Sequence, residues 1–104
     1  MLFTDFVHNT CQTGTMGTKD FRKKLPAYSY DLENHLIYQA QSSKFIWLSK
    51  SQIHRACSIP TEHQQYFAIF LALLVKNNLL AVEEKVPVLG SLINFYCLPN
   101  YLKK

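Results

Sequence analysis

Residues 48–53 read Leu-Ser-Lys-Ser-Gln-Ile and carry two signals that start a helix at Ser49. Gln52 follows Ser49 by three residues, which is the spacing of a capping box, where each side chain bonds the backbone N–H of the other residue. Leu48 and Ile53 flank the cap at the spacing of a hydrophobic staple. We therefore predict a short helix that begins at Ser49.

A longer helix and two strands are predicted after this short helix. Thr61 and Gln64 repeat the capping-box spacing, and the apolar pattern that follows them continues to Asn78. Asparagine tolerates the left-handed backbone that ends many helices. Residues 80–86 and 92–98 alternate apolar and polar side chains, as strands with one buried face do. The predicted order is therefore a short helix, a turn, a long helix and a two-stranded ribbon.

Residues 1–26 are expected to form an irregular N-terminal arm, and residues 27–104 a single α+β domain. Strand-compatible side chains occupy residues 1–7, and the arm ends in one basic cluster. The domain is expected to open with a helix from Asp31, a suitable N-cap, to about Gln41. A short strand is expected between this helix and the capping box.

Residues 47–60 resemble the second helix and the turn of winged helix-turn-helix proteins. The likeness is carried by Ile53, Ala56, Cys57 and Ile59, with Ser58 where those proteins commonly have Gly. Residues 74–80 are similar to the end of their recognition helix, and residues 92–98 to their last wing strand. The likeness covers about residues 31–99, with a looser similarity to the N-terminal domains of phage and plasmid replication initiators. It implies an α+β fold of three helices and a two- to three-stranded antiparallel wing.

A winged helix of this kind is expected to bind double-stranded DNA, with the start of its third helix in the major groove. Gln64 and Gln65 occupy that position and are expected to contact bases. Basic side chains are expected to contact phosphates, and the candidates are Arg22, Lys23, Lys24, Lys44, Lys50 and Arg55. The start of the third helix also carries Glu62 and His63, which is expected to be solvated. The resemblance thus implies a small DNA-binding regulator or replication-control protein.

The alternative is a protein-interaction module without DNA contact: an adaptor, an inhibitor of a partner complex or a dimerising subunit. The third helix directs Phe67 and Leu71 toward the core, and further apolar side chains lie away from it: Tyr66, Ile69 and Leu73. A helix that is apolar on both sides is deeply buried or has a partner. A second copy of the chain or another protein is therefore expected to cover this helix.

No enzymatic activity, cofactor or metal is expected. The three glycines have the wrong spacing for a phosphate-binding loop. The pairs His8–Cys11 and His54–Cys57 could supply four zinc ligands. A packing role for Cys57 in the predicted helix favours a core thiol over a ligand.

The bulk properties fit a single domain, since the chain has 104 residues and a net charge of +4. This mild positive charge permits contact with an anionic partner. The longest apolar run, residues 66–75, is too short to cross a membrane, which takes about 20 residues. Three cysteines without a framework spacing are typical of a reducing compartment. We therefore expect a cytoplasmic protein with no membrane contact.

Overall fold

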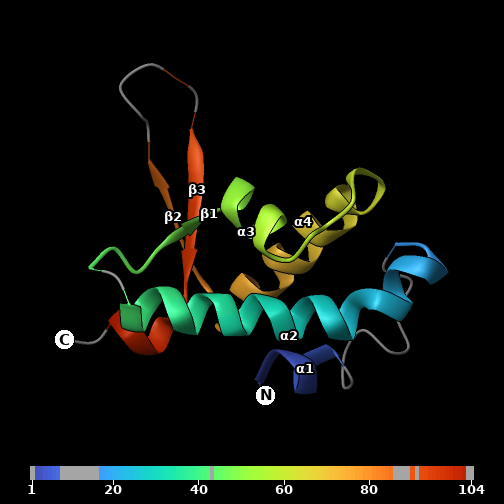
Figure 1. The fold of residues 1–104 in the computed structure, drawn as a ribbon, viewed down its shortest axis with the longest axis horizontal. Coiled ribbons are helices and arrows are strands. Elements are labelled where there is room, and N and C mark those ends of the chain that lie inside the picture. The colour runs from blue at the N-terminus through green and yellow to red at the C-terminus, as the bar shows by residue number, and fades with distance from the viewer. Residues whose placement is uncertain (1, 8–16, 43, 86–89, 91, 103–104) are drawn as a thin grey trace.

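The computed structural model describes residues 2–7, 17–42, 44–85, 90 and 92–102. The elements in chain order are α1 (Leu2–Phe6), α2 (Lys19–Ser42), β1 (Leu48–Ser49), α3 (Lys50–Ala56), α4 (Thr61–Lys76), β2 (Ala81–Lys85), β3 (Ile93–Cys97) and the 3-10 helix η2 (Pro99–Leu102). The strands form one antiparallel sheet in the order β1-β3-β2. Figure 1 shows α2 running along the molecule, with α1 on one side and α3 and α4 on the other. The predicted α+β class and the small antiparallel sheet are confirmed.

The start of α3 is the predicted capping box. The Ser49 hydroxyl oxygen accepts from the Gln52 backbone N–H at 3.2 Å, and the Ser49 N–H donates to Gln52 Oε1 at 2.9 Å. Ile53 is fully buried and anchors the helix to the core. The helix ends at Cys57, and Ser58 has a φ of 54°, a left-handed conformation that favours Gly.

The predicted capping box of α4 is wrong, although the helix does begin at Thr61. Pro60 is the N-cap and has no side-chain hydrogen bond to offer. Gln64 instead donates from Nε2 to the Ile59 carbonyl oxygen at 3.4 Å, so its side chain braces the turn. At the other end, Asn78 adopts a φ of 63°, as predicted for the residue that stops this helix.

The predicted N-cap at Asp31 is wrong, and residues 19–26 are helical rather than irregular, because α2 is one helix from Lys19. The predicted irregular residues 8–16 lie outside the described residues. Thr18 caps it, since its Oγ1 accepts from the Phe21 N–H at 3.1 Å. Proline inside a helix costs about 3 kcal/mol, whereas burying a side chain such as Phe21 or Leu25 stabilises by about 1.5–3 kcal/mol each. The buried face of the helix continues on both sides of the proline, so burial outweighs the local signal.

Residues 2–6 form the helix α1, whereas the sequence indicated that they could form a strand. Phe3 and Val7 are four residues apart and both are buried, which suits a helix that packs with one face. The Phe3 N–H donates to Glu33 Oε1 of α2 at 3.0 Å. The segment is therefore docked on α2 through one hydrogen bond and a buried helical face.

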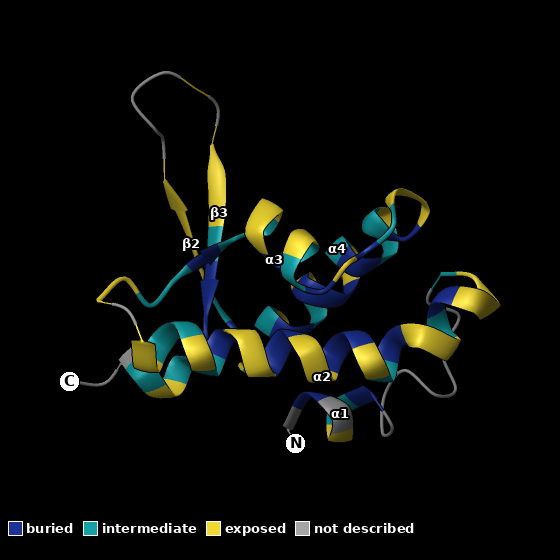
Figure 2. Cartoon of the chain, viewed as in Figure 1, coloured by how far each residue is buried: buried dark blue, intermediate teal, exposed yellow. Residues whose placement is uncertain are grey.

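The sheet stands beside the helices with one end buried and the other exposed. Tyr96 and Cys97 are buried at the end nearest α2, whereas Ile93 and Asn94 are exposed (Figure 2). β2 pairs only with β3 and forms an edge of the sheet. Of the expected strand at residues 45–48, only Leu48 pairs.

His63 is buried between α2 and α4, so its predicted solvent exposure is wrong. Its side chain is 3% exposed. Nδ1 lies 2.9 Å from the Tyr28 hydroxyl oxygen, and Nε2 lies 3.1 Å from Asp20 Oδ2. One neutral tautomer satisfies both contacts, with Tyr28 donating to Nδ1 and Nε2–H donating to Asp20. Burial, together with the carboxylates of Asp20 and Glu62, raises the pKa of Tyr28, which keeps its hydroxyl protonated.

Gly17 is the residue that lets the chain enter α2 beneath Tyr66. Its φ is +67°, and a Cβ there would lie 2.8 Å from Tyr66 Cγ. Its carbonyl oxygen accepts from Arg22 Nη1 at 2.9 Å. The Phe21 ring packs against both the Tyr66 and the His63 rings. These rings join the start of α2 to the start of α4.

Replacing Tyr28 with Phe should lower the free energy of unfolding by about 1–3 kcal/mol, because it leaves buried Nδ1 of His63 without a donor. Urea denaturation measures the change. Tyr30→Phe is the matched control, since Tyr30 is 52% exposed on the same helix and its loss should cost less than about 0.5 kcal/mol. Equal stability of the two variants would contradict a structural role for the Tyr28–His63 contact.

Candidate nucleic-acid interface

The segment around α3 is positive along its whole length. Residues 44–60 contain three cations and no carboxylate. Lys44 and Arg55 are exposed, and Lys50 is half-buried at the first residue of α3. Because no acidic neighbour in this segment neutralises these cations, the surface of α3 favours an anionic ligand.

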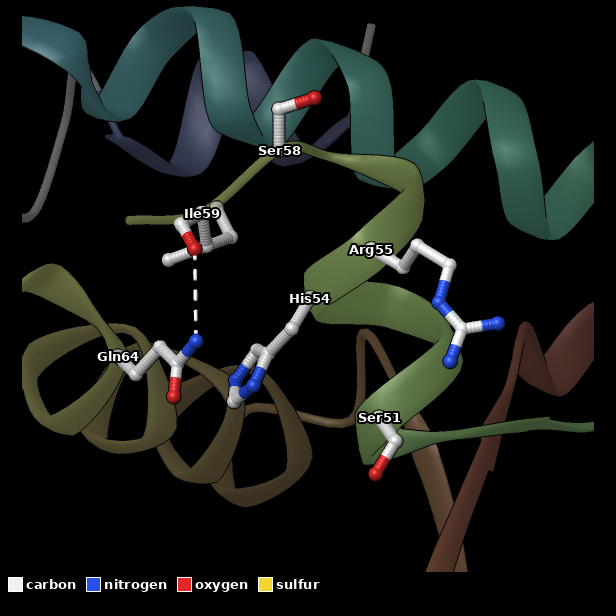
Figure 3. Close-up of a pocket in the computed structure, with 6 residues that line it drawn as sticks. All are labelled: Ser51, His54, Arg55, Ser58, Ile59 and Gln64. Carbon is white, nitrogen blue, oxygen red and sulfur yellow. Dashed lines mark hydrogen bonds between the residues drawn. The ribbon is translucent and has the colours of Figure 1, made fainter. Parts of the chain in front are cut away.

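An open groove of about 440 Å³ lies between α3 and α4. The residues that line it are Ser51, His54, Arg55, Ser58, Ile59 and Gln64. Figure 3 shows the His54 ring extending from α3 toward the Gln64 side chain, whereas the Arg55 guanidinium extends to the other side of α3. The groove thus offers hydroxyls and an amide beside one cation.

A second open groove, also of about 440 Å³, lies between the start of α3 and β3. Ser49, Lys50 and Ser51 form its α3 side, and residues 92–95 form its β3 side. Ser51 lines both grooves, so they meet on the outer surface of α3. Lys50 lines one groove and Arg55 lines the other, so each groove has one basic residue in its lining.

His54 serves packing within this surface. Its ring meets the Phe67 ring at a centroid distance of 5.9 Å, and burial, followed by the Lys50 charge, lowers the pKa of His54. Its Nε2 has no hydrogen-bond partner among the described residues. The imidazole is therefore held in its neutral form.

The predicted core role of Cys57 is confirmed, because its side chain is 4% exposed. Burial, with a smaller contribution from Asp31, raises the pKa of Cys57 to about 12, so its thiol is protonated and a poor metal ligand. Within the described residues, no three His, Cys, Asp or Glu side chains meet as a metal site would require. The pair His8–Cys11 lies outside the described residues.

The basic cluster expected to form an arm belongs instead to the first turns of α2. Arg22 is engaged with the Gly17 carbonyl, whereas Lys23 and Lys24 are exposed. The cluster lies at the end of α2 away from the sheet, whereas Lys50 adjoins the sheet (Figure 1). The cations are thus gathered at two places rather than along one flexible arm.

The start of α4 is less suited to phosphate than α3. Glu62 is exposed there. Asp20, which is 64% exposed, also lies at the start of α4, because its carboxylate is in contact with the His63 ring. Gln64 is half-buried with its amide nitrogen engaged, and Gln65 is exposed. Of the two predicted base-reading amides, Gln65 has the more accessible side chain.

The β2–β3 hairpin offers little free positive charge among its described residues. The Lys85 ammonium lies 3.8 Å from Glu83 Oε1 and 5.5 Å from the centre of the Phe45 ring. Glu84 is exposed next to this pair. The described part of the β2–β3 hairpin therefore carries an excess of one carboxylate.

The predicted protein-interface residues have different environments. Ile69 is 52% exposed in the middle of α4. Leu73 is half-buried, and Tyr66 is half-buried with its ring 5.6 Å from the Phe21 ring.

Among the described residues, no helix has both the length and the apolar character needed to cross a membrane.

Replacing His54 with Phe should reduce the loss of stability on acidification. A lowered folded-state pKa means that the unfolded chain, with a pKa near 6.5, binds the proton more readily. Stability from neutral His54 is therefore complete above this value and falls as the pH drops toward the folded-state pKa. Urea denaturation on both sides of this window tests the effect.

The same substitution at exposed His35 is the control for this experiment. Comparison with the wild type at each pH removes the contribution of all other titrating groups. Because His35 is exposed, its replacement should disturb the packing less than the replacement of His54 does. If His54→Phe retained the wild-type pH dependence, His54 would not be a source of acid sensitivity.

Comparison with known proteins identifies no relative of this chain. No protein-family model matches the sequence. No curated protein and no solved structure matches it either.

Proposed function

We propose that this chain is a winged helix-turn-helix domain that binds double-stranded DNA, as a small regulator or replication-control protein does. The observation that carries the proposal is the cationic surface of α3, flanked on both sides by open grooves. This surface lies on a fold whose element order resembles that of winged helices. DNA offers the repeating phosphates that two separated cations would contact.

The topology supports this proposal. A helix, a short strand, the helix pair α3–α4 and a two-stranded ribbon follow one another in the order that the resemblance implies. The three-stranded antiparallel sheet agrees with the implied wing. The left-handed residue Ser58 lies in the tight turn between the two helices, where Gly is common in that superfamily. The winged-helix assignment accounts for all three features together.

The charge distribution suggests how the domain would meet a duplex. Lys50 and Arg55 on α3 would contact phosphates, with Ser51 as a hydrogen-bond donor between them. Gln65 is the exposed amide on α4 that would reach a base, since Gln bonds adenine through two atoms. Glu62 would avoid phosphates and accept from a cytosine amino group. Backbone contact is thus assigned to α3 and base contact to α4.

Replacing Lys50 and Arg55 together with Ala should weaken binding to random-sequence duplexes. The dependence of log affinity on log salt should fall by about one for each lost phosphate contact. A mobility-shift titration between about 50 and 200 mM salt measures both effects. No binding by the wild type at the lower salt would overturn the proposal.

The matched control replaces Lys23 and Lys24 with Ala, which changes the net charge by the same amount. Both side chains are exposed on α2, at the end of that helix away from the groove between α3 and β3. If the α3 surface binds DNA, the α3 pair should reduce affinity more than the α2 pair. Equal losses would indicate a non-specific charge effect, and a larger loss from the α2 pair would move the interface to α2.

A protein-interaction module is the second candidate, and one observation favours it. Ile69 exposes half of its side chain on an otherwise well-packed helix, and the carboxylates Asp20 and Glu62 lie near the start of the same helix. This surface is better suited to protein than to phosphate. A chain that fails to bind duplexes yet associates through Ile69 would have this second function.

A further inference from the structure

On the exposed face of α4, an acidic residue and a basic residue lie at equal distances on either side of Ile69. Glu62, Ile69 and Lys76 are exposed and are spaced by seven residues. Seven residues are nearly two helical turns, so these side chains lie in line along the helix. At 1.5 Å per residue, the acidic and basic ends lie about 10 Å on either side of Ile69.

Two further pairs of side chains flank this line. Tyr66 and Leu73, both half-buried, lie on one side of Ile69. Gln65 and Ala72, both exposed, lie on the other side. Each pair has one member before Ile69 and one after it. The face therefore has matching positions on both sides of its centre.

We propose that α4 pairs with α4 of a second copy of this chain in antiparallel orientation, with Ile69 on the two-fold axis. Reversal places Glu62 of each copy opposite Lys76 of the other, which forms two equivalent ion pairs. It also places Tyr66 opposite Leu73 and Gln65 opposite Ala72. A two-fold interface requires this kind of self-complementary surface.

The charges favour an antiparallel over a parallel pair of α4 helices, and they favour a second copy of the chain as the partner. A parallel pair would bring Glu62 against Glu62 and Lys76 against Lys76, which is repulsive. The same charges also complement the dipole of their own helix, but that dipole does not account for the exposed Ile69 between them. A second copy matches all four kinds of pairing at once, because the pattern is its own complement.

This pairing does not depend on DNA, but it would affect how the domain contacts DNA. Lys50 and Arg55 belong to α3 and take no part in the α4 pair. Gln65 is covered when α4 pairs, so one helix cannot pair and read a base at the same time. Self-association would therefore compete with base contact while leaving the α3 cations to the duplex backbone.

Sedimentation analysis without DNA, over about 5–500 μM protein, tests the pairing, since an interface of one helix per copy is at the weak end of specific association. The wild type should change from monomer to dimer in this range. Ile69→Asp should weaken association about tenfold or more, because it places two carboxylates on the axis. Far-UV circular dichroism confirms that the variant, changed at an exposed position, remains folded.

Charge exchange tests the antiparallel geometry. Glu62→Lys and Lys76→Glu should each weaken self-association, because each variant alone brings like charges together at both ends. An equimolar mixture of the two should associate as the wild type does, and so should the chain that carries both substitutions. A wild type that stays monomeric, or single variants that associate as well as it does, would overturn the pairing. Neither outcome would affect the duplex-binding test of the α3 variants.

Discussion

The hydrogen bond of His63 to Tyr28 and its polar contact with Asp20 hold the first turn of α4 against the first half of α2. The contact matters beyond α4 because α4 is joined through short connections to α3 before it and β2 after it. The tight turn before α4 ties it to α3, and β2 follows α4 directly. Phe21 packs its ring against His63 and Tyr66 at the same junction, so the polar contacts are shielded by apolar ones. A polar network of this kind is stabilising only while all its members are satisfied.

The same junction separates the two kinds of surface on the molecule. Asp20 is drawn to His63 and, with Glu62, makes the start of α4 acidic. The α3 segment contains no carboxylate, so its two grooves remain positive. Under the proposals made here, backbone contact through α3 and pairing through α4 would use different surfaces of the domain. Base contact through Gln65 would compete with the pairing, because Gln65 lies on the paired face of α4.

Sequence patterns predicted those features that depend on neighbouring residues. The Ser49–Gln52 capping box, the left-handed Asn78 and the buried Phe67 all follow from short-range spacing, and all are present. The patterns failed where a local signal competed with burial. Pro26 and Asp31 suggested that a helix begins at Asp31, yet the apolar stripe of α2 runs through both positions and has more surface to bury. The sequence partly predicted which kinds of residue form the candidate site and which of them are exposed. It did not predict that they line two grooves.

The sequence by itself determined the α+β class, the start of α3, the end of α4 and the positive charge of the α3 segment, because each arises from residues a few positions apart. Tertiary structure alone decided that His63 is buried, since its partner Tyr28 is 35 positions away in the chain. It also decided that Gly17 must lie beneath Tyr66 and that Ser51 joins two grooves. The physical reason is that local backbone preferences act within a turn or two of the chain, whereas burial and buried hydrogen bonds are settled only when distant segments pack together.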